Sequence, residues 1–412
     1  MKFTAMAHGG EGLARDENGR VIFVPYAIAG ETARVEIIES RRGFARGRLV
    51  EILKASPARI VPRCPHFPPL PNFPMSGFCG GCQWQHIAYS AQIEFKTQIV
   101  RDQFARVAKL PDAPILPMLP AKREWYYRNN MQFAVNENGA LCLRAPDSHE
   151  LVPIRVCFII DEPIGEMFKT LELAAESFNG VTLRAGENTN SRLIILESDD
   201  PTIPEIETDE PVSIAFHSGD VTVPLLGNEA LTESVGGLTF QISPDSFFQV
   251  STPMAQTLVE LVSEFLAPRA TDILLDAYGG VGLFGLTLAP HLARVIELEE
   301  NPTAVEDARR NASTLSNVEF HTGRVEHVLP KLESSIDLAI VDPPRAGMER
   351  NALDALAAKK PRKIAYVSCD PATLARDTSR LLEQGYLLES VQPVDMFPQT
   401  YHIECVARFV AR

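Results

Sequence analysis

Short apolar runs alternate with helical patterns from residue 253 onward. Residues 253–266 have the spacing of an amphipathic helix, and further helical patterns separate the apolar runs that follow. The runs that read as buried strands are residues 272–276, 293–299, 337–342 and 363–369. Short apolar strands that alternate with helices are typical of a parallel sheet covered on both faces. The pattern predicts a Rossmann-like α/β domain over residues 241–412.

The first 57 residues follow a different pattern, in which strand-like runs are separated by turns. The runs are residues 21–24, 33–38 and 45–52, and Gly9-Gly10 and Asn18-Gly19 supply turns. We expect a small β-barrel over residues 1–57. Small barrels often bind oligonucleotides, although the fold alone does not establish that function.

Between these regions the apolar positions are less regular. Residues 58–90 are irregular and rich in proline and glycine, and residues 91–108 have a helical pattern. A loop of this length needs something else to organise it. Residues 120–240 are typical of an α+β segment, with strand candidates at 131–135 and 192–196. We therefore expect a multidomain chain whose central α+β domain covers residues 58–240.

The composition is that of a soluble globular protein. Of the 412 residues, 45% are hydrophobic and 22% are charged, and no apolar run reaches the roughly 18–20 residues of a membrane helix. The N-terminal residues lead into a polar, glycine-rich stretch without an apolar signal core. We expect a cytoplasmic protein without a membrane partner, and nothing in the pattern implies a protein partner.

The formal net charge of −14 argues at first sight against a nucleic-acid partner. The charge is unevenly spread, however. Basic residues outnumber acids over residues 96–128, residues 161–235 are mainly acidic, and four arginines lie together with no acid between them: Arg41, Arg42, Arg46 and Arg48. This pattern favours a local basic face that binds phosphate, and scattered solvated charge is the alternative.

Four of the predicted strands end in a residue with useful chemistry: Asp276, Glu299, Asp342 and Cys369. Ligands of open α/β sheets bind outside the carboxyl ends of the strands. Residues 276–282 form a glycine-rich turn without the Lys-Ser/Thr ending of a phosphate-binding loop. Glu299 follows 23 positions after Asp276, which suits ribose hydroxyls. S-adenosylmethionine fits this turn, and a nicotinamide cofactor or a purely structural turn are the alternatives.

Cys369 directly follows a buried strand in the sequence Ser368-Cys369-Asp370-Pro371. A helix that begins near Pro371 would place its positive dipole end beside the thiol and lower the thiol pKa. The alternative is a buried, unreactive cysteine. Residues 402–409 read as a strand, with Cys405 on its core face. Glu404 lies on the other face, either as a general base or as a solvated carboxylate.

Cys79-Gly80-Gly81-Cys82 is a close pair of metal-ligating cysteines. Cys64 lies upstream, and Cys157 closes a strand-like run downstream. Four thiolates hold either zinc or an iron–sulfur cluster, and the spacing does not separate the two. Cys142 is the rival for the fourth position, and we favour Cys157. Such a cluster would clamp the irregular loop onto the central segment.

The chain resembles the RNA uracil-5-methyltransferase family over nearly its whole length. Residues 1–57 resemble a TRAM domain, and residues 79–86 resemble the family's iron–sulfur segment. The other matching motifs are Ser246-Phe247-Phe248-Gln249, Asp342-Pro343-Pro344-Arg345, Ser368-Cys369-Asp370-Pro371 and His402-Ile403-Glu404-Cys405. There are two departures: Cys64 and Cys79 are 15 positions apart, which is more than usual, and Gly279 stands where a cysteine is common.

The resemblance implies a role for each candidate residue. Cys369 is implied as the nucleophile toward carbon 6 of uracil and Glu404 as the base that removes the carbon 5 proton, while Phe248 is either a stacking partner of the base or core. The residues implied to contact S-adenosylmethionine are Gln249, Tyr278, Gly280, Glu299 and Asp342. A 4Fe-4S cluster is implied on Cys64, Cys79, Cys82 and Cys157. The implied partner is RNA, with 23S rRNA expected first and tRNA as the alternative.

Two other functions stay open. An amino-methyltransferase acting on RNA or protein could use the Asp-Pro-Pro motif on the same fold, and it would not need Cys369. The chain could also be a non-catalytic RNA-binding protein, although the presence of both Cys369 and Glu404 argues against that.

Overall fold

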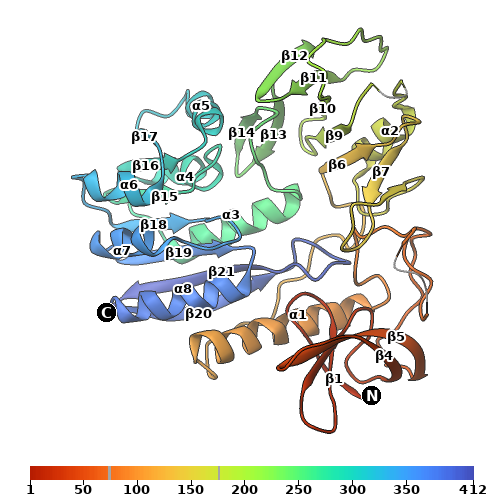
Figure 1. Ribbon diagram of the computed structural model, residues 1–412. Coiled ribbons are helices and arrows are strands. Elements are labelled where there is room, and N and C mark those ends of the chain that lie inside the picture. The colour runs from red at the N-terminus through yellow and green to blue at the C-terminus, as the bar shows by residue number, and fades with distance from the viewer. Residues whose placement is uncertain (73–75, 175–176) are drawn as a thin grey trace.

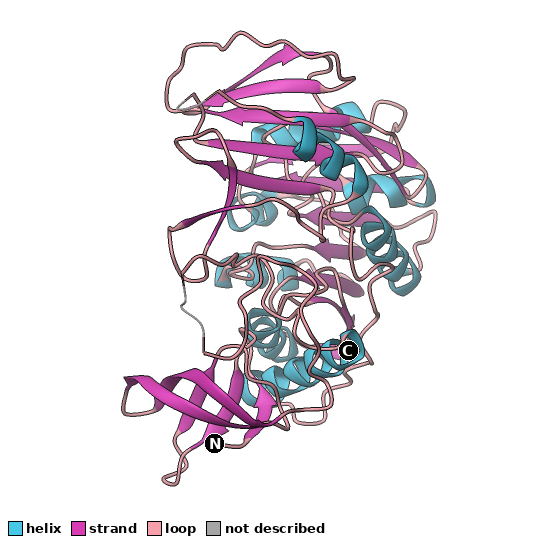
Figure 2. Ribbon diagram, turned by 90° about the vertical axis from the view of Figure 1, so that its right-hand side faces the viewer, coloured by secondary structure: helices cyan, strands magenta, loops and turns pink. Residues whose placement is uncertain are grey.

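The computed structural model describes residues 1–72, 76–174 and 177–412. It has three parts, which Figure 1 shows in order of colour: an N-terminal barrel in red, a central sheet in yellow to green and a C-terminal α/β sheet in green to blue. In Figure 2 the barrel projects at one end of the molecule and the central sheet lies at the other. None of the described helices is long and apolar enough to cross a membrane.

Five strands form the N-terminal barrel in the order β1-β2-β3-β5-β4. They are β1 (Phe3–Met6), β2 (Gly12–Arg15), β3 (Val21–Val24), β4 (Thr32–Ser40) and β5 (Phe44–Lys54). A bridge between Lys2 and Thr32 brings β1 against β4. Phe3, Ile22 and Val24 are fully buried in its core. The strands predicted at 21–24, 33–38 and 45–52 are confirmed.

Acids lie beside three of the four clustered arginines of the barrel, so the local positive charge is smaller than the sequence pattern indicates. The pairing of β4 with β5 sets Glu36 opposite Arg48 and Glu39 opposite Arg46. Arg48 forms an ion pair with Glu36, and Arg46 forms one with Glu11. No acid separates these arginines along the chain, but sheet pairing and a turn bring acids beside them.

After β5 the described chain forms no helix and no strand, apart from an isolated bridge, until α1 (Tyr89–Gln103). Helix α1 continues into the π-helical turn η1 (Phe104–Ala108), and together they confirm the helix predicted at 91–108. Of the irregular segment predicted at 58–90, residues 73–75 lie outside the described residues. Trp84 anchors this segment: it is fully buried, and its Nε1 donates to the carbonyl oxygen of Gly10 in the barrel at 2.9 Å.

The central part is mainly one seven-stranded sheet, in the order β12-β11-β10-β9-β6-β7-β8. The strands are β6 (Asn130–Val135), β7 (Leu141–Arg144), β8 (Leu151–Pro153), β9 (Gly180–Ala185), β10 (Arg192–Glu197), β11 (Ser213–Ser218) and β12 (Val221–Leu226). Helix α2 (Glu162–Thr170) packs Ile164 and Met167 against one face. The strands predicted at 131–135 and 192–196 are confirmed. A hairpin of β13 (Leu231–Val235) and β14 (Leu238–Ile242) follows.

The C-terminal sheet has the order β17-β16-β15-β18-β19-β21-β20. Its strands are β15 (Ile273–Ala277), β16 (Arg294–Glu299), β17 (Val318–Thr322), β18 (Leu338–Val341), β19 (Lys363–Ser368), β20 (Tyr386–Val394) and β21 (Glu404–Ala411). Neighbouring strands from β17 to β19 are parallel, and β21 is antiparallel to both of its neighbours. The four predicted strands are confirmed. The strand order reverses at β15, which is where open α/β sheets bind ligands.

Helices cover both faces of this sheet. They are α3 (Thr252–Leu266), α4 (Leu283–Leu288), α5 (Pro302–Asn311), α6 (Val325–Val328), α7 (Arg350–Ala358) and α8 (Pro371–Glu383), with the short turns η2 (Ala289–His291) and η3 (Leu329–Lys331). Successive residues of β15 enter opposite cores: Leu274 packs with α3 and α4, and Leu275 with α7 and α8. Val100 of α1 belongs to the second core. Helix α1 therefore fastens the segment after the barrel to the C-terminal sheet.

A buried ion pair completes this attachment and allows a stability prediction. The Nζ of Lys96 lies 2.7 Å from Oδ1 of Asp395, and both side chains are fully buried. Lys96→Met should lower the free energy of unfolding by about 3–5 kcal/mol, because it leaves a buried carboxylate without its partner. The matched control is Arg34→Met at the exposed Arg34–Glu51 pair, which should cost less than about 1 kcal/mol. Urea unfolding measures both, and equal losses would contradict the assignment.

Candidate active site and cysteine cavity

The carboxyl ends of four parallel neighbouring strands bring the predicted residues to one edge of the C-terminal sheet. Tyr278 follows β15, Glu299 ends β16, Asp342 follows β18 and Cys369 follows β19. Asp276 was also expected at this edge, but it lies inside β15 and is fully buried. Its carboxyl group therefore lies beneath the site and holds the backbone around it, through a hydrogen bond from the Gly285 amide.

The glycine turn after β15 is held by backbone bonds and by Glu299. The amides of Tyr278 and Gly279 donate to the carbonyl oxygen of Leu298, at 2.9 and 3.2 Å. Glu299 accepts from the amide of Gly280 through Oε2 at 3.0 Å. A side chain at Gly280 would meet nothing within 4 Å. The turn thus has open space on its outer side, and Glu299 keeps free acceptor capacity for further hydrogen bonds.

A pair of buried acids lies beneath this turn, and sequence reasoning missed one of them, Glu297. Asp276 and Glu297 are paired positions of β15 and β16. Burial raises the pKa of Asp276 to about 8, and burial together with the charge of Asp276 raises the pKa of Glu297 well above its usual value. Asp276 Oδ2 accepts from the Gly285 amide at 2.6 Å. A Cβ on Gly279 or Gly285 would overlap a carboxylate oxygen of Glu297. A side chain at either position would therefore force the buried Glu297 carboxyl group or the turn to shift.

The loop that carries Gln249 is fixed against the same edge. Ser243 and Ser246 donate their hydroxyls to the two carboxylate oxygens of Asp307 in α5, at 2.7 and 2.6 Å. Asn129 donates through Nδ2 to the carbonyl oxygen of Gln249 at 3.2 Å. Because α5 directly follows β16, these bonds bring the Gln249 loop to the end of that strand.

The two phenylalanines of this loop have opposite environments. Phe248 is 6% exposed and packs against Phe240, with 5.8 Å between the ring centroids. Phe247 is 68% exposed. The expectation that Phe248 stacks on a base is therefore wrong, and its alternative, a core position, is correct. Sequence could have pointed to Phe247 only through the alternation of inward and outward residues.

The environment of Cys369 opposes the predicted thiolate. Cys369 is half-buried, and helix α8 begins at Pro371, as predicted. Burial raises the thiol pKa to about 12, and the nearby charges of Glu404 and Asp342 act in the same direction. The predicted lowering of this pKa is wrong for the free protein, because burial, followed by the charges of two acids from other strands, outweighs the helix terminus.

Glu404 and Asp342 face the thiol from two directions. Glu404 begins β21, next to β19 in the sheet, and it is 4% exposed, so the solvated alternative for this residue is wrong. Burial, followed by the charge of Asp342, raises the pKa of Glu404 well above its usual value. Burial raises the pKa of Asp342 to about 7. Cys405, on the other side of the strand, is fully buried, as expected for core.

Asp370 caps helix α8 and links the site to the barrel. It accepts from the amides of Ala372 and Thr373, at 2.9 and 3.0 Å. Its Oδ2 lies 3.4 Å from Nε2 of His8 in the barrel. Burial acts to raise the pKa of Asp370, but these partners prevail and lower it to about 2. A charged carboxylate beside Cys369 thus holds the helix terminus and the barrel together.

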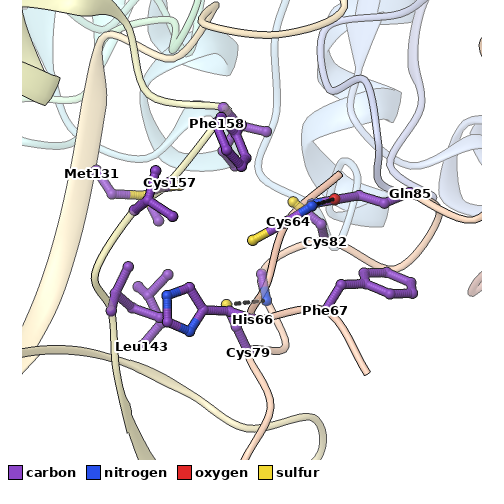
Figure 3. Close-up of a pocket in the computed structure, with 14 residues that line it drawn as sticks. Cys64, His66, Phe67, Cys79, Cys82, Gln85, Met131, Leu143, Cys157 and Phe158 are labelled. Atoms are coloured by element: carbon purple, nitrogen blue, oxygen red, sulfur yellow. Dashed lines mark hydrogen bonds between the residues drawn. The ribbon is translucent and has the colours of Figure 1, made fainter. Parts of the chain in front are cut away.

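Four cysteines line one cavity at the junction of the irregular segment and the central sheet (Figure 3). They are Cys64, Cys79, Cys82 and Cys157, and the cavity volume is about 20 Å³. The remaining walls are mostly apolar and include Phe67, Met131 and Leu143. Among the described residues, no group of three or more His, Cys, Asp or Glu side chains is arranged to hold a metal ion.

The pKa values show that these thiols share one environment. Burial raises the pKa of Cys79 to about 12, and charges at Cys157 and Cys64 act in the same direction. Burial also raises the pKa of Cys82 and Cys157. Cys142 lies apart on β7, where its Sγ donates to the carbonyl oxygen of Ala140 at 3.4 Å. Cys64 reaches the cavity in spite of its long spacing to Cys79.

Three features together are those of an S-adenosylmethionine-dependent methyltransferase. They are the strand order with an antiparallel β21, the open glycine turn and the acid at the end of β16.

The family model "tRNA (Uracil-5-)-methyltransferase" matches residues 228–411, and the TRAM domain model matches residues 2–50. A Streptomyces avermitilis protein described as an uncharacterized RNA methyltransferase is 36% identical over 421 residues, which cover 98% of this chain and 95% of that protein. One from Thermosynechococcus vestitus is 32% identical and covers 99% and 96%.

A solved structure agrees over the full length. The Pyrococcus abyssi tRNA (uracil-54, C5)-methyltransferase in complex with S-adenosyl-L-homocysteine is 25% identical, superposes with a TM-score of 0.77 and covers 100% of both chains. This chain belongs to the RNA uracil-5-methyltransferase family, with an N-terminal TRAM domain and a methyltransferase fold that uses S-adenosylmethionine.

The fit between Gly279 and Glu297 predicts a paired mutational effect. Gly279→Ala should weaken S-adenosylmethionine binding by about 1–3 kcal/mol, because the new methyl group overlaps the Glu297 carboxyl and displaces the turn. Adding Glu297→Gly should restore much of the affinity, since it removes the overlapping group. Gly165→Ala, where a Cβ meets nothing, is the control. Calorimetry measures the three affinities, and independent, additive effects would contradict the fit.

Proposed function

We propose that the protein methylates carbon 5 of a uridine in RNA through a covalent bond between Cys369 and carbon 6 of the base, with Glu404 as general base. The observation that carries this proposal is the meeting of a half-buried thiol and a buried carboxyl group at the ligand edge of the sheet, where β19 and β21 pair. Covalent catalysis of this kind divides one difficult transfer into easier steps.

The chemistry uses both groups in sequence. The sulfur of Cys369 bonds to carbon 6, and the electron pair of the C5–C6 double bond moves toward the oxygen on carbon 4. S-adenosylmethionine supplies, when bound, the electrophilic methyl group that carbon 5 takes up. Glu404 then removes the carbon 5 proton, the double bond re-forms, and the sulfur leaves as the Cys369 thiolate.

The raised pKa values of Cys369 and Glu404 fit a site that is completed by a cation. In the free protein, burial and neighbouring acids favour the protonated forms of both groups. A sulfonium cation at the same edge favours their ionised forms, as an opposite charge within about 4–6 Å does in general. We therefore expect Cys369 to become nucleophilic only when S-adenosylmethionine is in place.

The proposed cofactor residues are Gln249, Tyr278, Gly280, Glu299 and Asp342. Glu299 holds the turn through the Gly280 amide and has acceptor capacity left for ribose hydroxyls. The open space beside Gly280 admits a ligand close to the backbone. Gln249 approaches from the loop that Asn129 and Asp307 fix.

A 4Fe-4S cluster is the proposed occupant of the cysteine cavity, held by Cys64, Cys79, Cys82 and Cys157. Four thiols around one space with apolar walls suit it, because iron ligation stabilises thiolates that burial alone disfavours. Its role would be to hold the segment before α1 against the central sheet.

The proposed substrate is an unpaired uridine in an RNA loop, since the base must leave its stack to expose carbon 6. We place 23S rRNA first, as the sequence resemblance to the family implies. The Pyrococcus abyssi protein, described as a tRNA enzyme, keeps tRNA as the second candidate.

Trapping the covalent intermediate tests the reaction. With S-adenosylmethionine and RNA in which 5-fluorouracil replaces uracil, the protein should form an adduct that survives denaturation. The adduct persists because Glu404 can remove a proton from carbon 5 but cannot remove a fluorine. Cys369→Ala should form none. Glu404→Gln should reduce turnover on normal RNA by roughly 10²–10⁴-fold. Denaturing gels and sequencing of the bound RNA give the readout and the target.

The matched control is Cys405→Ala, which removes the neighbouring core thiol and should keep the adduct. An adduct that persists in Cys369→Ala would refute the assignment of the nucleophile. Cosubstrate-dependent methylation of carbon 5 without any adduct would refute the covalent mechanism.

The cluster proposal predicts which cysteines bind iron. After anaerobic purification, Cys64→Ser should lose most of the bound iron and the associated visible absorption, as should Cys157→Ser. Cys142→Ser should keep both, because its thiol lies on β7 outside the cavity. Elemental analysis decides the outcome: zinc in place of iron, or full iron in Cys64→Ser, would overturn the proposed site.

A further inference from the structure

A partly exposed cluster of three aromatic rings and a guanidinium group lies beside the cysteine cavity. The guanidinium carbon of Arg63 lies 4.3 Å from the ring centroid of Phe158, 5.3 Å from that of Tyr126 and 5.5 Å from that of Trp125. Its Nη2 donates to the Tyr126 hydroxyl at 2.9 Å. Both Trp125 and Tyr126 meet Phe158 edge to face. We call these four residues the stacking platform.

Part of the platform faces solvent, while Trp125 and Phe158 are half-buried. Tyr126 is 40% exposed, and Arg63 is also exposed. The neighbouring Val61 is 89% exposed and Ile60 is 45% exposed. Single exposed apolar side chains are ordinary, whereas rings and a guanidinium group held in mutual contact form a surface suited to binding. Tyr126 also has a φ of 54°, a left-handed backbone that is costly for a bulky residue, so the structure holds this ring in place.

The platform is tied to the cysteine cavity. Arg63 directly precedes Cys64, and Phe158 directly follows Cys157. The stacking of Arg63 on Phe158 thus joins the two segments that carry these cysteines. Filling the cavity would fix the platform as a rigid unit.

The platform is also close to the active-site edge. Tyr126 lies three residues before Asn129, which donates to the carbonyl oxygen of Gln249. Three residues span at most about 10 Å. An RNA strand bound at the Gln249 loop can therefore reach the platform with its neighbouring nucleotides.

We infer that the stacking platform binds an unstacked nucleobase of single-stranded RNA near the target uridine. Every base has a π face, and bases stack on tyrosine rings and arginine planes with little sequence preference. Lys122 and Arg123 are exposed nearby, although Arg123 also pairs with Glu187. The inference deepens the proposed function, because it takes RNA as the substrate and adds a second contact outside the reacting site.

Tyr126→Ala separates base stacking from charge. Fluorescein-labelled oligouridine and an abasic oligomer of the same length are the probes, and fluorescence anisotropy gives the Kd for each. Tyr126→Ala should raise the Kd for oligouridine by roughly 5- to 100-fold and leave the Kd for the abasic oligomer unchanged. Tyr126→Phe should bind like the wild type, because it keeps the ring.

Arg63→Lys is the second variant, since it keeps the charge and loses the planar face. It should weaken oligouridine binding without changing the salt dependence, which counts phosphate contacts. Leu387→Ala, 44% exposed on β20, is the control and should change neither Kd. Unchanged S-adenosylmethionine affinity and iron content show that each variant folds.

The inference is overturned if Tyr126→Ala binds oligouridine like the wild type, or if it loses affinity for both oligomers equally. The outcome of the trapping experiment does not depend on the outcome of this binding experiment. A ring-dependent affinity without carbon 5 methylation would retain the platform and reject the proposed function, and methylation without ring dependence would do the reverse.

Discussion

A buried ion pair between Lys96 and Asp395 fixes residues 395–403, the segment that leads into Glu404 of the candidate active site. The Nζ of Lys96 reaches this segment from α1, and the carbonyl oxygen of Gln399 accepts from two amides of the cysteine-bearing loop. Tyr127, just before the central sheet, donates its hydroxyl to the same segment. Five residues after Gln399, the chain enters β21 at Glu404. The position of the proposed base is therefore set by contacts from three distant regions, and a buried charge whose partner must be present makes this junction specific.

The site concentrates buried acids where a cation is expected. Burial raises the pKa of Asp276 to about 8 and of Asp342 to about 7, and it raises the pKa of Glu297 and Glu404 well above their usual values. An acid whose pKa is raised by folding binds more protons in the folded state. Stability therefore falls as pH rises from the unfolded pKa near 4 to the folded pKa near 7 or 8. In the proposed reaction, a bound sulfonium cation would offset this cost, and cofactor binding would then be coupled to the ionisation of Cys369.

Local patterns predicted the strands of the C-terminal sheet and the position of Cys369 because each depends on a short run of residues. They could not predict which side chains from distant segments lie beside a given residue. The positive charge of the arginine cluster was overestimated because β4 supplies acids to Arg46 and Arg48. The thiol pKa of Cys369 was predicted in the wrong direction because burial, followed by the charge of Glu404 on another strand, raises it. Glu297 was missed because its importance lies in the register that sets it beneath the glycine turn.

The compensated barrel changes how RNA binding should be understood in a chain with a net charge of −14. Pairs such as Arg48–Glu36 are exposed, and an exposed pair is worth at most about 1 kcal/mol. A phosphate can therefore displace the carboxylate from the arginine at little cost, but repulsion from the displaced acid remains. Charge alone gives weak attraction under these conditions. Contacts that do not depend on charge, such as insertion of the target base and stacking beside it, must then supply much of the affinity, and both select RNA whose bases are already unstacked.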